Sequence, residues 1–218
     1  RVVKASKGNY EGIGIIIATG WPKKKKKKII GEKEFTGNGV SYCATCDGFF
    51  TKGRITSVFG NGHEAVEEAL FLTKHAKEIN VFCDKDDLEV EAELKEQLLS
   101  NENVKLFTNA KLLEVLGNQY VEKVKVDIAG EIKEMESDFA FLYLGTKSNS
   151  ELYQGFAKLN DEGYIITDEN MACEVEGVWA AGDIRERTVR QVTTAVADGT
   201  LAGIEAIKYV MKKKREVK

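Results

Sequence analysis

The feature that most constrains the fold is a strand, a glycine turn, a helix and a second strand in direct succession. Residues 55–59 are rich in β-branched and aromatic side chains, Gly60 to Ala65 form a glycine-containing turn, and residues 65–77 have amphipathic spacing. Residues 79–83 form a second apolar run. Such a unit requires parallel strands joined by a right-handed crossover. The sequence therefore predicts an α/β fold with a parallel sheet.

The segments that follow continue the alternation of strand and helix and then turn antiparallel. They predict, in order, a helix, a strand, a hairpin and two further strands, over residues 88–99, 104–107, 112–126, 131–135 and 139–144. After Gly145 we expect short strands at residues 164–167 and 178–180 and a long helix at residues 190–211. This order favours a three-layer α/β domain with an antiparallel excursion.

Charge and hydropathy exclude several classes of protein. Six consecutive lysines at residues 23–28 cannot pack into a core, so we interpret them as a solvated linker rather than a nucleic-acid-binding patch. The net charge of −3 gives no reason to expect nucleic acid as a partner. No apolar run has the length of a membrane span, and residues 1–8 lack the apolar core of a signal peptide. We therefore expect a cytoplasmic protein with no membrane partner.

The four cysteines are unevenly spaced: Cys43 and Cys46 form a C-x-x-C pair, whereas Cys83 and Cys173 stand apart. In a reducing compartment such a pair indicates redox chemistry or metal binding. Neither histidine stands at ligand spacing from the pair, so we favour redox chemistry and predict no metal site. A helix that begins within the motif would let the sulfurs meet and would stabilise a thiolate. Asp47 would be within reach to exchange a proton with a sulfur.

The glycine turn has the pattern G-x-G-x-x-A of a dinucleotide-binding site. Gly60 permits the turn, Gly62 lets a pyrophosphate approach the backbone, and Ala65 allows close helix packing. Glu64 lies in the same turn and is a further candidate for cofactor binding. The alternative is a plain strand-to-helix turn.

A third motif follows the predicted strand at residues 178–180. There Gly182 and Asp183 place a carboxylate where it could accept a hydrogen bond from a polyol hydroxyl. The helix predicted from Arg190 begins nearby, and its N-terminus could face a ring carbonyl. The chemistry of these residue types alone gives this motif modest specificity.

Together the three motifs resemble the thioredoxin reductase family, in order and in approximate spacing. The sequence GVSYCATCDGFF at residues 39–50 is similar to the active-site signature of the family. The sequence AAGDIRERTVRQVTTAVADG at residues 180–199 is similar to its C-terminal flavin-binding signature, and IATG at residues 17–20 is similar to the turn beside the flavin nucleotide. The resemblance covers essentially the whole chain.

The resemblance implies an organisation in two domains. A Rossmann-like, three-layer NAD(P)H-binding domain at residues 27–146 would carry the C-x-x-C pair. It would be inserted in an FAD-binding domain of the same class, of which residues 1–26 and 147–218 would be the C-terminal part. The glycine-rich element with which the family begins, and which holds the ADP part of FAD, is expected to be missing. The resemblance also implies a homodimer.

The resemblance further implies a role for each motif. Electrons would run from a nicotinamide cofactor through FAD to the disulfide and on to thioredoxin or a thioredoxin-like protein. Cys46 would accept electrons from the flavin, Cys43 would attack the protein disulfide, and Asp47 would be the acid/base. The cofactor contacts in the two domains would be Gly60, Gly62, Glu64 and Ala65 for nicotinamide, and Thr19, Gly20, Gly182, Asp183, Arg190, Gln191 and Val192 for FAD.

The choice of electron donor depends on residues 84–87, which read Asp-Lys-Asp-Asp. NADPH-using relatives have a histidine and arginines there for the 2′-phosphate. Acidic residues would repel that phosphate, whereas Asp84 could accept from a ribose 2′-hydroxyl. We therefore expect NADH, with NADPH as the alternative. The alternative functions for the protein are a ferredoxin-dependent disulfide reductase, a peroxiredoxin-reducing flavoprotein and a non-catalytic nicotinamide-binding module.

Overall fold

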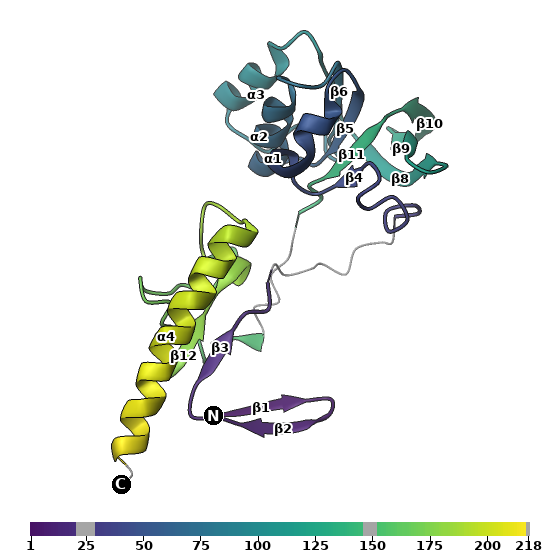
Figure 1. Ribbon diagram of the computed structural model, residues 1–218. Helices are drawn as coiled ribbons and strands as arrows, with labels where there is room; N and C mark the ends of the chain where they lie inside the picture. The colour runs from purple at the N-terminus through teal and green to yellow at the C-terminus, as the bar shows by residue number, and fades with distance from the viewer. Residues whose placement is uncertain (21–28, 146–151, 217–218) are drawn as a thin grey trace. The chain divides into compact units, whose positions relative to one another are not determined.

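A computed structural model describes residues 1–20, 29–145 and 152–216 of the chain. The lysine run at residues 23–28, predicted to be a linker, lies outside the described residues. The chain divides into two compact units (Figure 1). Unit 1 comprises residues 1–25 and 146–218, and unit 2 comprises residues 26–145. Each unit has its own apolar core.

Unit 2 is built on a five-stranded parallel sheet with the order β4-β11-β5-β6-β7. Its strands are β4 (Val40–Ser41), β5 (Ile55–Phe59), β6 (Glu78–Phe82), β7 (Val104–Phe107) and β11 (Phe139–Leu142). The parallel pairing of β5 with β6 is the one that the strand–helix–strand pattern requires. The α/β class is therefore confirmed.

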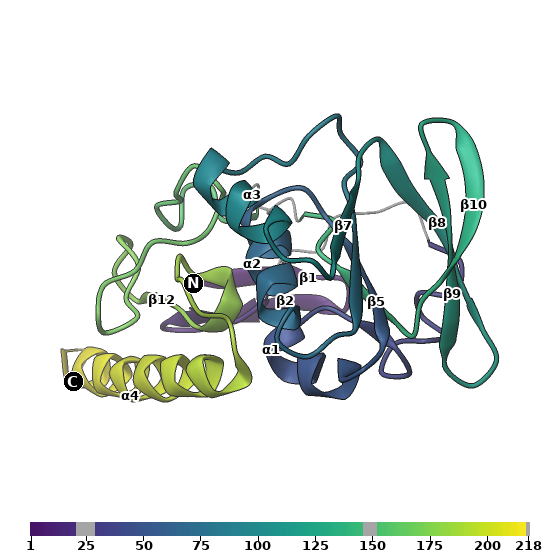
Figure 2. The ribbon, with the colours of Figure 1, turned by 90° about the horizontal axis from the view of Figure 1, so that it is seen from above.

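The two faces of this sheet are covered by different kinds of element. Helices cover one face and an antiparallel sheet covers the other (Figure 2). The elements are α1 (Ala44–Asp47), α2 (His63–Leu72) and α3 (Ala92–Leu99) on the helical side, and β8 (Ala110–Gly117), β9 (Val121–Ile128) and β10 (Glu131–Glu136) on the other. A short 3₁₀ helix, η1 (Gly48–Thr51), follows α1.

Alternation along the central strands explains how one sheet serves both layers. Val58 and Val81 belong to the core under the helices, whereas the next residues, Phe59 and Phe82, belong to the core under the antiparallel sheet. The Phe59 and Phe82 rings stack with their centroids 4.7 Å apart. All four side chains are buried, so both faces of the sheet are removed from water.

The described residues of unit 1 form two small sheets and one long helix. Its elements are the hairpin β1 (Val2–Ala5) and β2 (Gly8–Glu11), the parallel pair β3 (Ile15–Ile17) and β12 (Val178–Ala180), the 3₁₀ helix η3 (Gly182–Ile184), and α4 (Val192–Glu216). The helix α4 packs on β3 and β12, and Tyr209 of α4 meets Trp179 of β12 edge to face.

The strand predicted at residues 164–167 is wrong. Within it only Ile165 forms isolated bridges, to Leu159 and Arg185. The Ile166 amide donates to the Lys158 carbonyl and the Asn160 amide donates to the Tyr164 carbonyl, and these two bonds complete a single antiparallel bridge that does not extend into a ladder. β-branched side chains at this place reflect burial in the core of unit 1 rather than membership of a sheet.

Candidate active site

The redox pair lies directly after the edge strand β4, where the chain turns into α1. Cys43 and Cys46 form a disulfide with a Cα–Cα distance of 5.3 Å. Cys43 is the N-cap residue of α1, and its Sγ accepts a hydrogen bond from the Cys46 amide at 3.1 Å. Cys46 is exposed and Cys43 is partly buried. The short helix therefore holds the two sulfurs together at the surface of unit 2.

Asp47, the predicted acid/base, is tied into the same turn through Ser41. The Ser41 hydroxyl donates to Asp47 Oδ2 at 2.6 Å and accepts from the Cys43 amide at 3.2 Å. A cavity of about 540 Å³ opens beside this pair, and its lining includes Phe50 and Tyr120. Cys43, Cys46 and Asp47 are thus brought together in one turn, and Asp47 also lines the cavity.

A pair of residues that the sequence analysis missed supports the redox turn from behind. Glu68 of α2 accepts hydrogen bonds from the amides of Ala44 and Thr45, at 2.5 and 3.2 Å. The Tyr143 hydroxyl, at the end of β11, donates to Glu68 at 3.1 Å. Burial, followed by the charge of Glu68, raises the pKa of the Tyr143 phenol. No motif marked either residue, because their role depends on a contact between distant elements.

The glycine turn joins β5 to α2 at the same edge of the sheet, its carboxyl edge. Gly60 has a φ of +159°, and a Cβ there would lie 2.5 Å from the Tyr143 carbonyl oxygen and 2.7 Å from the Ala65 Cβ, so only glycine fits. Gly62 is the N-cap of α2 and lacks a side-chain cap, and a Cβ on it would meet nothing within 4 Å. Glu64 is exposed in the first turn of α2. The start of the helix is therefore open to an anionic ligand.

Asp84 follows β6, also at the carboxyl edge, and its amide donates to the Asn61 side chain at 3.2 Å. The nearby cations already have acidic partners. The Lys85 ammonium pairs with Glu89, and the Lys95 ammonium pairs with Asp87 at 2.6 Å. These contacts lower the pKa of both Glu89 and Asp87. The loop beside the glycine turn is therefore acidic, and its one lysine, Lys85, is paired with Glu89.

In unit 1 the flavin candidates follow the paired strands β3 and β12, so they share one edge of that sheet. After β3, the Thr19 hydroxyl lies 2.6 Å from the Tyr153 hydroxyl, and Gly20 has a φ of +73°. After β12, Gly182 has a φ of +77°. Asp183 Oδ1 is buried and has no hydrogen-bond partner among the described residues. This orphaned acceptor is the kind of atom that a ligand hydroxyl satisfies.

The remaining flavin candidates lie in the segment that leads into α4. The Arg190 guanidinium stacks over the Tyr164 ring, 4.2 Å from its centroid. The backbone amide of Gln191 donates to the Thr194 hydroxyl at 3.1 Å. The side chain of Val192 is 79% exposed. An exposed valine at the start of a helix is free to meet a ligand or another chain segment.

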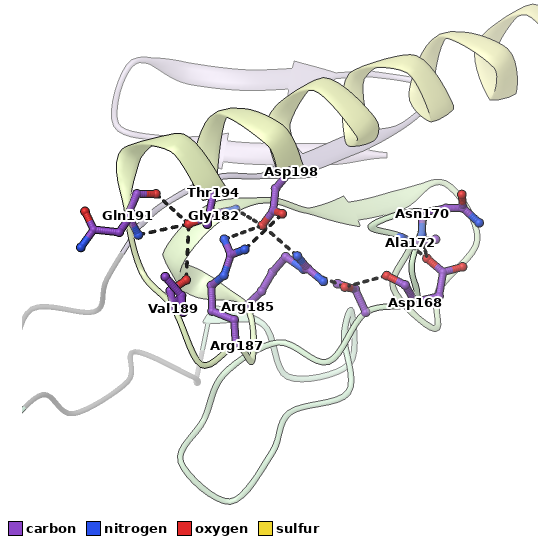
Figure 3. A network of polar contacts seen from close by, with 11 residues as sticks. Asp168, Asn170, Ala172, Gly182, Arg185, Arg187, Val189, Gln191, Thr194 and Asp198 are labelled. Atoms are coloured by element: carbon purple, nitrogen blue, oxygen red, sulfur yellow. Dashed lines mark hydrogen bonds and ion pairs between the residues drawn. The ribbon is translucent and has the colours of Figure 1, made fainter. Parts of the chain in front are cut away.

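A second feature that the sequence analysis missed is a buried carboxylate that organises this region (Figure 3). Asp198 of α4 accepts from the Gly182 amide at 3.0 Å, from Arg185 at 2.8 Å and from Arg187 at 2.9 Å. Its side chain is 7% exposed, so both ion pairs are shielded from water. Asp198 thus fixes the loop that carries Gly182 and Asp183 to the helix.

The two remaining cysteines differ from the redox pair in bonding and in burial. Cys83 and Cys173 are buried free thiols. Burial raises the pKa of Cys83, and it raises the pKa of Cys173 to about 11. A buried thiol with a raised pKa is a poor nucleophile, so reactivity is confined to the Cys43–Cys46 pair.

Within the described ranges, no helix combines the length and the apolar character needed to cross a membrane.

Comparison with known proteins agrees with this geometry. The family model of the pyridine nucleotide-disulphide oxidoreductases matches residues 2–199. The chain is 41% identical to a thioredoxin reductase of Peptoclostridium litorale and 38% identical to one of Bacillus subtilis, covering 96% of this chain in both cases and 69% and 67% of the relatives. The crystal structure of thioredoxin reductase from Streptococcus pyogenes superposes with a TM-score of 0.88 at 33% identity, over 97% of this chain and 70% of that one.

The range matched by the family model, residues 2–199, takes in parts of both units and spans the positions of the redox pair, the glycine turn and Asp183. The resemblance seen in the sequence is therefore confirmed. The chain belongs to the pyridine nucleotide-disulphide oxidoreductase family, as a thioredoxin reductase-like oxidoreductase.

Proposed function

We propose that the protein passes electrons from a nicotinamide cofactor through FAD to the Cys43–Cys46 disulfide and on to thioredoxin or a thioredoxin-like protein. The observation that carries the proposal is the carboxyl edge of unit 2, where the disulfide follows β4 and an open, uncapped glycine turn follows β5, two parallel strands that flank β11. Ligands of parallel α/β sheets bind at this edge. The resemblance to the family adds a homodimer and a cytoplasmic location to the proposal.

The two cofactors would occupy different units. Gly60, Gly62, Glu64 and Ala65 would bind the nicotinamide cofactor, which makes residues 27–146 its domain. Residues 1–26 and 147–218 would belong to the FAD-binding domain. There the buried Asp183 Oδ1, which lacks a partner among the described residues, would accept from a flavin hydroxyl. Bound nicotinamide and FAD would supply two electrons as a hydride equivalent.

Reduction of the disulfide takes up two electrons and two protons, breaks the S–S bond and leaves two thiols. Cys46 would receive the electrons, and Asp47, held by Ser41, would deliver a proton to the sulfur that leaves. The Cys43 thiolate would then attack the substrate disulfide and form a mixed disulfide. Attack by Cys46 on Cys43 would release the substrate as a dithiol and restore the starting disulfide.

The protein substrate would dock on the aromatic surface beside the redox turn. Phe49 and Phe50 lie in η1, the 3₁₀ helix that follows α1, and are 70% and 66% exposed. Exposed aromatic side chains next to a reactive group are typical of an interaction site. Phe50 also lines the cavity beside Ser41 and Asp47, so a partner that covers these rings would reach the sulfurs.

The direct test is turnover of a purified bacterial thioredoxin. With FAD and a nicotinamide donor present, the protein should reduce the thioredoxin disulfide, followed by donor absorbance and by release of thiols. Flavin absorbance should be bleached when donor is added without air and restored by oxidised thioredoxin. A protein that carries FAD but transfers no electrons to thioredoxin would refute the proposed substrate.

The acidic loop leads to a prediction about the donor. A 2′-phosphate would face Asp84, Asp86 and Asp87, while Lys85 is already paired with Glu89. We expect kcat/KM with NADH to exceed that with NADPH by at least about tenfold. The reason is that repulsion between the 2′-phosphate and a single carboxylate costs about 1 kcal/mol or more. Asp84→Arg should narrow or reverse the ratio, since a guanidinium binds phosphate in two places.

The control is Glu102→Arg, which makes the same charge change at an exposed site before β7, at the opposite edge of the sheet. It should leave the donor ratio unchanged. Steady-state kinetics with both donors decide the matter. A clear wild-type preference for NADPH would overturn the role given to Asp84, and failure with both would favour a donor such as reduced ferredoxin.

A further inference from the structure

Glu68 reaches from the middle of α2 to the start of the redox helix. One carboxylate oxygen, Oε2, accepts from the Ala44 amide at 2.5 Å and from the Thr45 amide at 3.2 Å. The other oxygen, Oε1, accepts from the Thr45 hydroxyl at 3.2 Å. These amides belong to the first turn of α1, where backbone N–H groups have no partner within the helix. Glu68, which belongs to α2, therefore caps the N-terminus of a different helix, α1.

Tyr143 holds this carboxylate in place. Its hydroxyl donates to Glu68 at 3.1 Å and accepts from the Ala44 amide at 2.9 Å. The tyrosine is 7% exposed, so the contact is sheltered from water. The backbone of Tyr143 in turn lies against Gly60. The redox turn is thus fixed to α2 and to the end of β11 by buried or partly buried hydrogen bonds at Ala44 and Tyr143, whereas the bonds from Thr45 to Glu68 are exposed.

The same contacts have an electrostatic consequence for the sulfurs. Cys43 Sγ already accepts from the Cys46 amide, so the helix end that would stabilise a thiolate is shared between a sulfur and a carboxylate. A negative charge at this place disfavours a second anion beside it. Loss of a proton from the reduced pair is therefore opposed by Glu68.

We propose that Glu68 is a positioning residue that fixes the redox turn and opposes ionisation of its thiols, which makes the reduced Cys43–Cys46 pair a stronger reductant. Reduction adds two electrons and two protons to the disulfide and leaves two thiols. Ionisation of a thiol stabilises the reduced form, so a group that opposes it favours release of the electrons. This inference rests on the proposed function, in which the pair is a redox couple.

The experiment measures the thiols directly and needs no flavin or nicotinamide. The full chain is reduced, and the rate of iodoacetamide alkylation of Cys43 and Cys46 is followed by mass spectrometry between about pH 5 and pH 10. Glu68→Gln keeps an acceptor oxygen and removes the charge. It should lower the pKa of the more reactive thiol by about one unit.

The redox equilibrium with dithiothreitol gives a second readout. At pH 8.5, a fall of one unit from an ordinary thiol pKa should shift the equilibrium toward the reduced pair about fivefold, or about 20 mV. Glu67→Gln makes the same charge change at the neighbouring, exposed position of α2 and should change neither quantity. Glu68→Asp retains the charge and should shift the thiol pKa less than Glu68→Gln.

The outcomes separate this inference from the proposed function. If Glu68→Gln leaves the thiol pKa and the equilibrium within twofold of wild type, the role of Glu68 is refuted while the redox couple stands. Equal effects of Glu67→Gln and Glu68→Gln would refute a specific role too. If the wild-type pair does not cycle with dithiothreitol at all, the proposed function itself fails.

Discussion

Cys43→Ser and Cys46→Ser should each lower thioredoxin reduction by more than about a thousandfold, because neither variant can form the disulfide that carries two electrons. The fold should survive both changes. Cys43 caps α1 through its Sγ, and serine is a preferred N-cap residue, so its hydroxyl can take over the contact with the Cys46 amide. Cys46 is exposed, so its replacement leaves no cavity.

The two variants should also differ from each other. If Cys43 attacks the substrate, Cys46→Ser should trap thioredoxin as a mixed disulfide on Cys43, detectable as a mass increase reversed by dithiothreitol. Cys83→Ser is the control, because Cys83 is a buried thiol outside the redox turn, and its turnover should stay within about twofold of wild type. Near-normal turnover of either redox-pair variant would show that the electron path is wrong.

Asp198→Ala should cause the largest loss of stability in unit 1, about 3–5 kcal/mol. The substitution leaves the guanidinium groups of Arg185 and Arg187, 12% and 16% exposed, without their shared anion, and it removes the acceptor of the Gly182 amide. Truncating one member of a buried ion pair is costly because the remaining charges stay desolvated. The loop that carries Asp183 should lose its anchor on α4 at the same time.

Urea unfolding followed by Trp179 fluorescence measures this effect, because Trp179 is buried in unit 1 beside Tyr209 of α4. The other tryptophan, Trp21, is replaced by phenylalanine in all variants so that one probe remains. Glu205→Ala is the control, since Glu205 forms an ion pair with Lys208 near the surface of the same helix, and it should cost less than about 1 kcal/mol. A similarly small loss for Asp198→Ala would mean that the loop is held by other contacts.

Most of the parallel sheet of unit 2 could be predicted from local patterns. The strands β5 and β7 have the predicted bounds, because continuous runs of β-branched and aromatic residues are bounded by turn residues there. Helix ends were less predictable: α3 begins at Ala92 rather than at residue 88. The hairpin of β1 and β2 was not predicted, since all its residues are exposed and its sequence has no core-facing alternation.

In the candidate site, too, features set by local spacing could be predicted from the sequence, whereas contacts between distant residues could not. The redox pair and the glycine turn were visible because spacing within a few residues determines their chemistry. Glu68 and Asp198 were not, because each acts on backbone amides that lie 16 to 24 residues away along the chain. In α2 and α4 both look like ordinary polar helix residues. Only the folded arrangement shows that each carboxylate holds a loop.

The division of the chain bears on how such proteins can be altered by recombination. Unit 2 is continuous in sequence, whereas unit 1 is made of two segments that flank it. The disulfide, the glycine turn, Asp84 and the Glu68–Tyr143 contact all lie in the continuous part. One recombination event on either side of unit 2 would therefore exchange the residues for donor preference and thiol chemistry together, as one continuous gene segment. The scaffold outside would keep its own residues, including Asp183 and Asp198.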